Sequence, residues 1–359
     1  MKMCEALAEA GHEVTLFGRR GQTDSCADIF AHYGTGATFR LQLVETSYRR
    51  GIRGVERLVR SLRAARHLPA PDLWYGRDAL LLLLCVGAIA APVVYESHQF
   101  PDGLRKRLIE GRLFGHPQFA RLVTISHALA NAYEADASFR PRDIMVAPVG
   151  ADVVREVPGE SPLSDHTNRP KVGYVGSLYR GRGVEMLMAI AAELPSVSFH
   201  VVGGSARDLD ELRRTTTVPA NVTLYGHIRH ASVPSYIAHC DVMVAPYQER
   251  IEIGSGADTS RWASPMKILE YMGQAKPIVC SDLPVLRELL RDRDSAMLVA
   301  PGDVKAWKAK IAEVVADPGL ARRLGEHARV DIETRHSWSL RAKRVVDGLQ
   351  PAREAPSKS

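Results

Sequence analysis

The sequence predicts an α/β protein with two doubly wound parallel sheets, and three observations indicate this class. The chain has 359 residues, more than one ordinary hydrophobic core accommodates, so two domains of about 150 residues each are expected. Short apolar, β-branched runs alternate with helical patterns along nearly the whole chain, which is typical of βαβ units. A polar, proline-bearing stretch without periodicity, residues 154–170, separates the two halves.

The first half opens on a helical pattern, residues 1–10, and then carries five apolar runs that predict strands. The expected strands are residues 13–17, 73–75, 93–95, 122–125 and 144–147. A very apolar stretch, residues 79–95, is shorter than the roughly 20 residues that a membrane span needs, and Pro92 interrupts it. It therefore predicts a buried helix that leads into a strand. A doubly wound domain normally begins with a strand, so the opening helix indicates that the first strand is missing from this sequence.

The second half repeats the pattern, and a last helical pattern follows it. The expected strands are residues 172–175, 198–202, 222–225, 242–245, 277–280 and 296–299. In open α/β sheets the ligand site lies beyond the carboxyl ends of the strands. The predicted organisation is a first domain over 1–155, a linker over 156–170, a second domain over 171–335, a helix over 336–350 and a disordered tail over 351–359.

The composition limits the chemistry that the chain supports. Five cysteines without a CxxC pair argue against a zinc site and favour a reduced, cytoplasmic setting. The opening residues lack the pattern of a secretory signal. A net charge of +6 suits a protein that handles anions, and on charge alone phosphate-bearing small molecules, nucleic acid and anionic membrane all stay open.

A glycine-rich turn follows the first predicted strand of the second half. That strand ends at Gly176, residues 180–183 read Arg-Gly-Arg-Gly, and a helix is expected from about Val184. Glycines allow close backbone approach, a helix start offers free N–H groups, and arginines add charge, so the combination predicts phosphate binding. The spacing matches neither a Walker loop nor GxGxxG. The structural alternative is a tight turn with a solvated arginine.

A second motif begins at Ser264. Pro265 suits the first position of a helix, with Ser264 as its cap. Lys267 and Glu270 then share one helical face, where the lysine can meet phosphate and the carboxylate can accept bonds from a ribose diol. The alternative is a capped surface helix with an ordinary Lys/Glu pair. The apolar residues of this helix are expected in the core: Met266, Ile268, Leu269 and Met272.

Together the two motifs resemble the donor-binding half of family 4 glycosyltransferases, which are retaining enzymes of the GT-B fold, with two Rossmann-like domains that face each other across a cleft. Other stretches resemble later landmarks of that family, in the same order: residues 3–17, 95–98, 124–126, 147–152, 222–227 and 240–247. The resemblance covers nearly the whole chain. It implies transfer of a hexose from a nucleotide-diphosphate sugar, UDP- or GDP-linked, to an unidentified acceptor. It also implies that no metal or other cofactor takes part, and that the last helix crosses back to the first domain.

The resemblance further implies roles for single residues. Arg182 and Lys267 would face the donor diphosphate, and Glu270 would hold the ribose hydroxyls. His98, beside Glu96, would line the sugar pocket near the reacting carbon, so that His98, Arg182 and Lys267 are the candidate catalytic residues. Backbone groups of Gly226 and His227 would flank the base. The other expected donor contacts lie in the two motifs: Gly176, Ser177, Arg180, Ser264, Pro265, Met266 and Ile268.

The sequence departs from the family pattern in three places. Trp262 stands where the first glutamate of the family's second motif is expected, and Ser177 stands where many members have an arginine that Arg180 would replace. The family's first strand and glycine-rich loop do not match any stretch of this sequence. Three alternatives therefore stay open: a nucleotide-sugar epimerase, a non-catalytic nucleotide-sugar-binding protein or partner subunit, and, less favoured for want of GxGxxG, a nicotinamide dehydrogenase.

Two further stretches carry charge. Asp292-Arg-Asp294 has the spacing of a metal-binding Asp-x-Asp motif, but its alternating charges are typical of a solvated turn. Arg49 to Arg66 holds seven arginines and one glutamate, with the apolar residues on one side of a helical wheel. This pattern predicts either a solvated basic face or peripheral contact with anionic lipid at the inner face of the membrane, at ~1 kcal/mol per basic residue. Nucleic acid is not expected, because no aromatic interleaving accompanies the charge.

Overall fold

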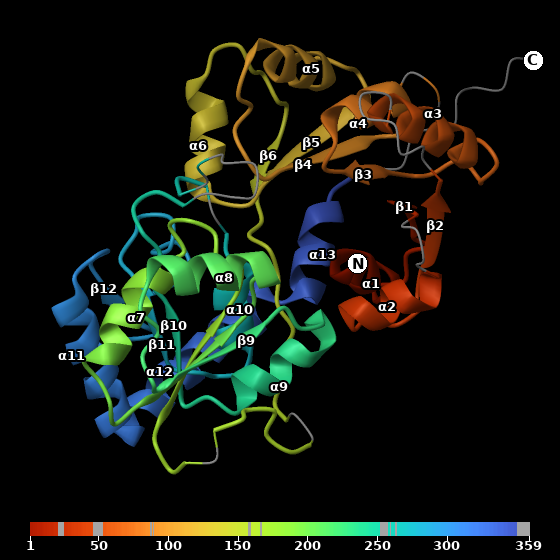
Figure 1. Ribbon diagram of the computed structural model, residues 1–359. Helices are drawn as coiled ribbons and strands as arrows, with labels where there is room; N and C mark the ends of the chain where they lie inside the picture. The colour runs from red at the N-terminus through yellow and green to blue at the C-terminus, as the bar shows by residue number, and fades with distance from the viewer. Residues whose placement is uncertain are drawn as a thin grey trace, which may run out of the picture. The chain divides into compact units, whose positions relative to one another are not determined.

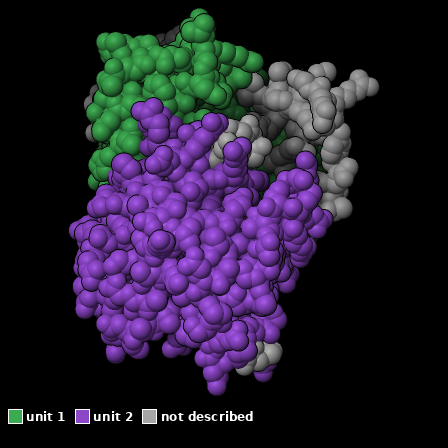
Figure 2. All heavy atoms as spheres, turned by 60° about the vertical axis from the view of Figure 1, so that its left-hand side comes forward, with its two compact units in different colours: residues 1–148, 341–359 green, residues 149–340 purple. Residues whose placement is uncertain are grey.

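The computed structural model describes residues 1–20, 25–45, 53–86, 88, 90–156, 159–165, 167–251, 258, 260–262 and 264–349, with residues 19 and 53–58 described by their backbone. The chain divides into two compact units, Met1–Pro148 with Arg341–Ser359, and Val149–Leu340 (Figure 2). This division falls before the predicted linker over 156–170, because the chain after Pro148 already packs on the second unit. Val149 N donates to Ser264 Oγ, and Val154 N donates to Gly273 O.

The first unit contains two parallel sheets (Figure 1). β1 (Thr15–Arg19) pairs with β2 (Arg40–Val44), and a separate four-stranded sheet has the order β3-β4-β5-β6 (Trp74–Gly76, Val93–Ser97, Phe119–Thr124 and Ile144–Val146). In the described ranges no strand joins one sheet to the other. The helices are α1 (Lys2–Glu9), α2 (Cys26–Tyr33), α3 (Arg53–Ala65), α4 (Ala79–Val86), α5 (Leu104–Phe114) and α6 (His127–Ala135).

The five predicted strands of this unit are confirmed, with boundaries shifted by a few residues, and so is the opening helix. The helix that starts at Ala79 is also confirmed, but it is buried only in part, because Leu84 is 38% exposed. β2 was not predicted. Its sequence Arg-Leu-Gln-Leu-Val alternates polar with apolar residues, and only Val44 is buried. A strand at the edge of a small sheet buries little apolar surface, so it lacks the continuous apolar run by which the other strands were found.

The second unit is built on one six-stranded parallel sheet in the order β12-β11-β10-β7-β8-β9. Its strands are β7 (Lys171–Val175), β8 (Ser198–Val202), β9 (Val222–Gly226), β10 (Val242–Ala245), β11 (Ile278–Ser281) and β12 (Met297–Val299). The strand order reverses between β7 and β10. Such a switch point leaves a crevice at the carboxyl ends of the two strands, which is where ligands bind in open α/β sheets.

Helices connect these strands. They are α7 (Val184–Ala192), α8 (Ala206–Thr215), α9 (Val233–Ala238) with the 3-10 turn His230–Ser232 before it, α10 (Met266–Gly273), α11 (Val304–Ala316) and α12 (Pro318–Asp331). The last helix, α13 (Trp338–Val346), is shorter than the predicted 336–350, because the π-helical turn Ile332–His336 and the extended Ser337 precede it. The predicted tail over 351–359 lies outside the described residues.

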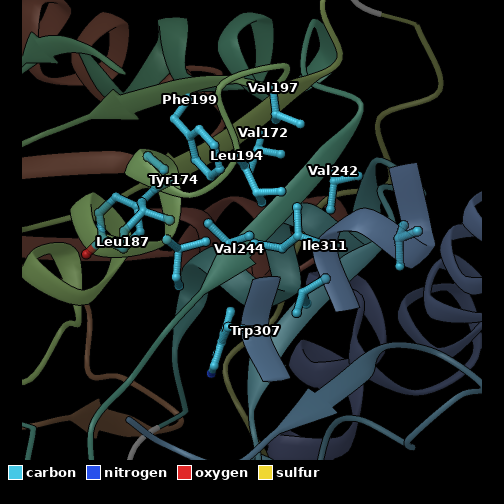
Figure 3. Close-up of a cluster of buried hydrophobic side chains, with 14 of the residues drawn as sticks. Val172, Tyr174, Leu187, Leu194, Val197, Phe199, Val242, Val244, Trp307 and Ile311 are labelled. Atoms are coloured by element: carbon cyan, nitrogen blue, oxygen red, sulfur yellow. The ribbon is translucent and has the colours of Figure 1, made fainter. Parts of the chain in front are cut away.

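The core of the second unit lies between the sheet and its helices (Figure 3). Tyr174 and Phe199 come from β7 and β8, and Trp307 comes from α11; all three are fully buried. Trp307 Nε1 donates to Ala300 O at 3.2 Å, so its one polar group is satisfied. The strands are apolar on both faces because helices cover both.

We expect Trp307→Ala to lower the free energy of unfolding by about 3–5 kcal/mol, because it leaves a cavity under α11. Urea denaturation followed by far-ultraviolet circular dichroism measures the loss. Lys308→Ala, on the same helix but with a half-exposed side chain, is the control and should stay within about 0.5 kcal/mol of wild type. Equal stability of the two variants would contradict the place of Trp307 in the core.

Candidate functional site

The loop after β7 lies against the segment after β10, at the switch point of the sheet. A Cβ at Gly181 (φ +83) would come within 1.9 Å of Arg250 O, and one at Gly183 (φ +78) within 1.7 Å of Pro246 O. Gln248 N also donates to Gly181 O at 2.9 Å. Only glycine permits these positive φ values together with this close approach. The predicted phosphate loop is therefore held in place by backbone contacts.

Lys267, in the first turn of α10, lies next to this loop. A Cβ at Gly176 would be 3.3 Å from Lys267 Nζ. The ammonium lies 3.9 Å from the ring centroid of Tyr174 and 4.6 Å from that of Tyr247. The side chain is buried, and Nζ has no hydrogen-bond partner among the described residues. The two predicted motifs thus meet at one buried cation.

Arg182 is the second cation of this cluster. Its guanidinium carbon lies 5.3 Å from the ring centroid of Tyr247, and its Nε has no hydrogen-bond partner in the described chain. Both cations contact one aromatic ring, a favourable arrangement for each alone, but the two charges repel each other. Burial lowers the pKa of Lys267 well below its usual range, and the charge of Arg182 lowers it further. Burial also raises the pKa of the neighbouring Cys280 thiol to about 12.

The two helices that begin at this cluster have no side-chain caps. In the same unit Ser205, Asp303 and Asp317 cap α8, α11 and α12, whereas the N-cap residues of α7 and α10, Gly183 and Pro265, provide no capping side chain. The prediction that Ser264 caps α10 is wrong: its hydroxyl accepts a bond from Val149 N at 3.3 Å, and the helix begins at Met266, one residue after Pro265. No capping side chain therefore occupies the first amides of either helix, although in α10 Ile268 N already donates to Pro265 O at 3.1 Å.

The other residues of the second motif separate into core and surface. Ile268, Leu269 and Met272 are fully buried, as predicted for the core, so the Ile268 side chain packs inside the unit rather than on a ligand surface. Met266 is 43% exposed, and its prediction as a core residue is wrong because it lies in the open first turn of the helix. Glu270 is half-buried and does not pair with Lys267; its carboxylate lies 3.3 Å from His230 Nε2.

The ends of β7, β8 and β9 also come together. Gly203 N donates to Gly226 O at 2.8 Å, and a Cβ at Gly203 would come within 2.0 Å of Gly176 O. The exposed His227 follows Gly226 directly. Gly203 was not among the predicted site residues, although the pair Gly203-Gly204 directly after an apolar run is a usable signal. Of the remaining loop residues, Ser177 O accepts a bond from Tyr174 Oη at 2.7 Å, and Arg180 is exposed.

Three buried tyrosines of the cluster were also missed. Tyr174 and Tyr247 line the lysine, and Tyr271 Oη accepts a bond from Val175 N at 2.8 Å, which fastens α10 to the end of β7. Burial raises the pKa of Tyr174 and Tyr247, so both stay neutral. No spacing rule identifies such residues, because they come from β7, the segment after β10 and α10, and meet only in the folded unit.

The remaining predicted residues do not belong to this cluster. His98 and Glu96 are part of the first unit. Trp262 is half-buried, with the Arg261 guanidinium 4.9 Å from its ring centroid. Asp292 Oδ1 accepts a bond from Leu298 N of β12, and Asp294 bonds Arg291 and, in α12, His327, so both carboxylates already have protein partners. Across the described residues, no three His, Cys, Asp or Glu side chains gather into a metal-binding group.

The basic stretch Arg49 to Arg66 lies only partly within the described residues, because 49–52 are outside them and 53–58 are described by backbone alone. In the rest of α3, Arg60 and Arg63 are exposed and Ala65 is buried, as a one-sided helix requires, and Arg66, directly after the helix, is also exposed. Val59 departs from the predicted apolar side and is 40% exposed. Within the described ranges, no helix has both the length and the apolar character needed to cross a membrane.

Comparison with solved structures defines the fold. Sucrose-phosphate synthase of Thermosynechococcus elongatus is similar with a TM-score of 0.74 and 19% identity, over 96% of this chain and 90% of that one. HepE of Anabaena, solved in complex with UDP-glucose, is similar with a TM-score of 0.68 and 16% identity, over 93% of this chain and 98% of that one. The protein has the GT-B fold of glycosyltransferases, as the sequence resemblance predicted.

Comparison with protein families defines the class further. Residues 1–155 match the model of Glycosyltransferase Family 4, and residues 169–317 match that of Glycosyl transferases group 1. Alpha-D-kanosaminyltransferase of Streptomyces kanamyceticus is 29% identical over 167 residues, 45% of this chain and 40% of that protein. The chain spans about half the length, or less, of the curated relatives it matches. The chain belongs to the family 4 glycosyltransferases of the GT-B fold.

Proposed function

We propose that this chain transfers a hexose from a nucleotide-diphosphate sugar to an acceptor, with retention of configuration and without a metal ion. The observation that carries the proposal is Lys267: a buried ammonium without a hydrogen-bond acceptor in the described chain, beside a second cation, Arg182. Leaving a charge buried and unpaired costs several kcal/mol. A diphosphate supplies the negative charge and the acceptor oxygens that Lys267 Nζ and Arg182 Nε lack in the described chain.

The surrounding groups suit the rest of a nucleotide sugar. The uncapped starts of α7 and α10 offer backbone amides to the phosphates. The carboxylate of Glu270, whose side chain is 24% exposed, suits a ribose diol, and the backbone around Gly226 and His227 suits the base. HepE, which shares the fold, was solved with UDP-glucose, and Alpha-D-kanosaminyltransferase is named for sugar transfer. The first similarity supports a nucleotide-sugar donor, and the second supports sugar transfer.

The proposed chemistry requires stabilisation of the leaving group. When the bond between sugar and diphosphate breaks, negative charge grows on the diphosphate oxygens. Arg182, Lys267 and the amides of the two helices are placed in advance for that charge, which is the effective form of electrostatic catalysis. In a retaining transfer the acceptor attacks from the side that the diphosphate leaves. A phosphate oxygen then takes the proton of the acceptor hydroxyl, and no protein nucleophile is needed.

Thermal denaturation with a panel of nucleoside diphosphates and their sugars tests the donor site. A ligand at 100 times its Kd adds ~2.7 kcal/mol to the stability of the protein. Glu270→Ala should weaken binding of the preferred nucleotide by about 1.5–3 kcal/mol, the value of hydrogen bonds to a charged group. It should leave binding of inorganic diphosphate unchanged, because that ligand has no ribose.

Glu211→Ala, an exposed carboxylate on α8, is the control and should bind both ligands normally. Equal loss of both ligands in Glu270→Ala would contradict the assignment to the ribose. Product analysis with the preferred donor separates the functions: transfer to an added acceptor supports the proposal, and an isomerised free donor indicates an epimerase. Binding without turnover indicates a non-catalytic nucleotide-sugar-binding protein.

A further inference from the structure

Arg341 connects the last helix with the interior of the first unit. It lies in α13, which is drawn beside α1 in Figure 1, and it is only 3% exposed. Its guanidinium donates to a carboxylate, a hydroxyl and two carbonyls: Glu96 Oε2 at 2.9 Å, Tyr75 Oη at 3.2 Å, Pro148 O at 2.8 Å and Ala147 O at 3.1 Å. So many acceptors fix the guanidinium in one position.

Glu96 contacts both Arg341 and His98 and so connects the two side chains. The carboxylate is buried at the end of β4; Oε2 accepts from Arg341, and Oε1 accepts from His98 Nε2. Burial alone disfavours the charged form, but the bonds from His98 and Arg341 outweigh it and lower the pKa of Glu96. The carboxylate is therefore ionised and each of its oxygens has a partner. Removing Arg341 would leave Glu96 Oε2 without this donor and would take away the positive charge that balances the buried carboxylate.

The other ring nitrogen of His98 identifies the tautomer. Arg77 Nη2 lies 3.0 Å from His98 Nδ1. A guanidinium has donors and no acceptor, so Nδ1 must accept, and the ring proton sits on Nε2, facing Glu96. The side chain of His98 is 26% exposed, which leaves part of the ring open. Two arginines and one carboxylate thus determine both the proton position and the orientation of this ring.

We propose that Arg341 is a positioning residue for His98: through Glu96 it holds the imidazole in the Nε2-protonated tautomer and in one ring orientation. Arg341 and Glu96 are 245 positions apart in the sequence, so α13 must be docked before His98 is ordered. The catalytic value of this arrangement rests on the proposed function and on the role near the reacting carbon that the family resemblance implies for His98. The tautomer itself does not depend on that function.

The test is the ring nitrogen signals of His98 in protein labelled with ¹⁵N-histidine, assigned by comparison with His98→Gln. Wild type should show one fixed tautomer, with a protonated Nε2 and an unprotonated Nδ1. In Arg341→Met the signals should move toward the average of the two tautomers. Arg341→Lys keeps the charge but loses the two-pronged set of guanidinium donors. Its His98 nitrogen signals should therefore lie between those of wild type and those of Arg341→Met. Unchanged signals in Arg341→Met would overturn the proposal.

Arg121 provides a matched control. It is also a buried arginine of the first unit and donates to Val345 O at 2.9 Å and Asp347 O at 3.0 Å, so it holds the same end of the chain without reaching Glu96. Arg121→Met should leave the His98 signals as in wild type. An equal change in Arg121→Met would mean that helix docking, not positioning, moves them, and would also overturn the proposal. If Arg341→Met does not fold, Glu96→Gln provides the same readout.

Kinetics give a second readout. Displacing a group at a reaction centre by about 1 Å costs up to ~100-fold in rate, so Arg341→Lys should lower kcat by roughly 10- to 100-fold while the KM for the donor changes little. Arg121→Met should keep the wild-type kcat. An equal loss in the two variants would contradict the positioning role. If no donor supports transfer by wild type, the proposed function fails, while the nitrogen signals still decide the role of Arg341.

Discussion

Lys267→Met is expected to stabilise the unliganded protein and, at the same time, to abolish its thermal response to nucleoside diphosphates. The ammonium is buried beside Arg182 without a hydrogen-bond acceptor in the described chain. Methionine fills a similar volume without charge. Replacing buried charge with apolar side chains of similar volume is often stabilising by about 1–4 kcal/mol, and each kcal/mol raises Tm by about 2–4 °C for a unit of this size.

The stability that Lys267→Met gains over wild type should depend on pH in a defined direction. The pKa of Lys267 in the folded protein lies well below its ordinary value of 10.5. Between these two values the unfolded chain holds a proton that the folded chain does not, so the wild type becomes more stable as pH rises through that window. Methionine does not titrate. The stability difference between Lys267→Met and wild type should therefore be largest below the folded-state pKa and should shrink toward pH 10.5.

Lys276→Met is the matched control for this experiment. Lys276 also belongs to the second unit, but its Nζ donates to Ala238 O at 2.6 Å and Cys240 O at 2.7 Å. Its loss leaves two carbonyls unsatisfied, so Lys276→Met should be less stable than wild type and should still bind the nucleotide. A destabilised Lys267→Met, or one that keeps the nucleotide response, would show that Lys267 is an ordinary core residue.

Arg182→Met should lower kcat/KM for the donor by a hundredfold or more, and Arg180→Met should have a much smaller effect. Removal of one group that stabilises charge in the transition state costs about 3 kcal/mol. Arg182 lies over Tyr247 with an unpartnered Nε in the described structure, whereas Arg180, two residues earlier in the same loop, is exposed. An exposed charge acts through water and is screened by salt.

Initial rates of donor consumption, measured at two ionic strengths, distinguish the two arginines. The Arg182→Met defect should persist at high salt, and the small Arg180→Met defect should diminish. The unliganded Tm of Arg182→Met should not fall, because its loss also removes the repulsion on Lys267. Equal defects in the two variants would mean that the net charge of the loop, rather than one placed guanidinium, binds the diphosphate.

Most of the secondary structure follows from local sequence patterns. β8 and β10 were predicted to the residue because a parallel strand covered on both faces must be apolar throughout. The chain before α10 was predicted less well. Ser264 has the composition of a helix cap, but its hydroxyl bonds Val149, which is distant in the sequence. β2 was missed for a different reason, because only Val44 of it is buried and its sequence therefore lacks a continuous apolar run.

The sequence by itself determined the fold class, the family and the two motifs that supply Arg182 and Lys267. Each of these can be recognised from local patterns of neighbouring residues along the chain. Only the tertiary structure decided that the two cations share the ring of Tyr247 and that Lys267 is buried without a described acceptor. The physical reason is the reversal of strand order between β7 and β10, which brings three distant segments to one point. The burial of Lys267 and its repulsion by Arg182, which make the site suited to an anion, arise only when these segments meet in the folded unit.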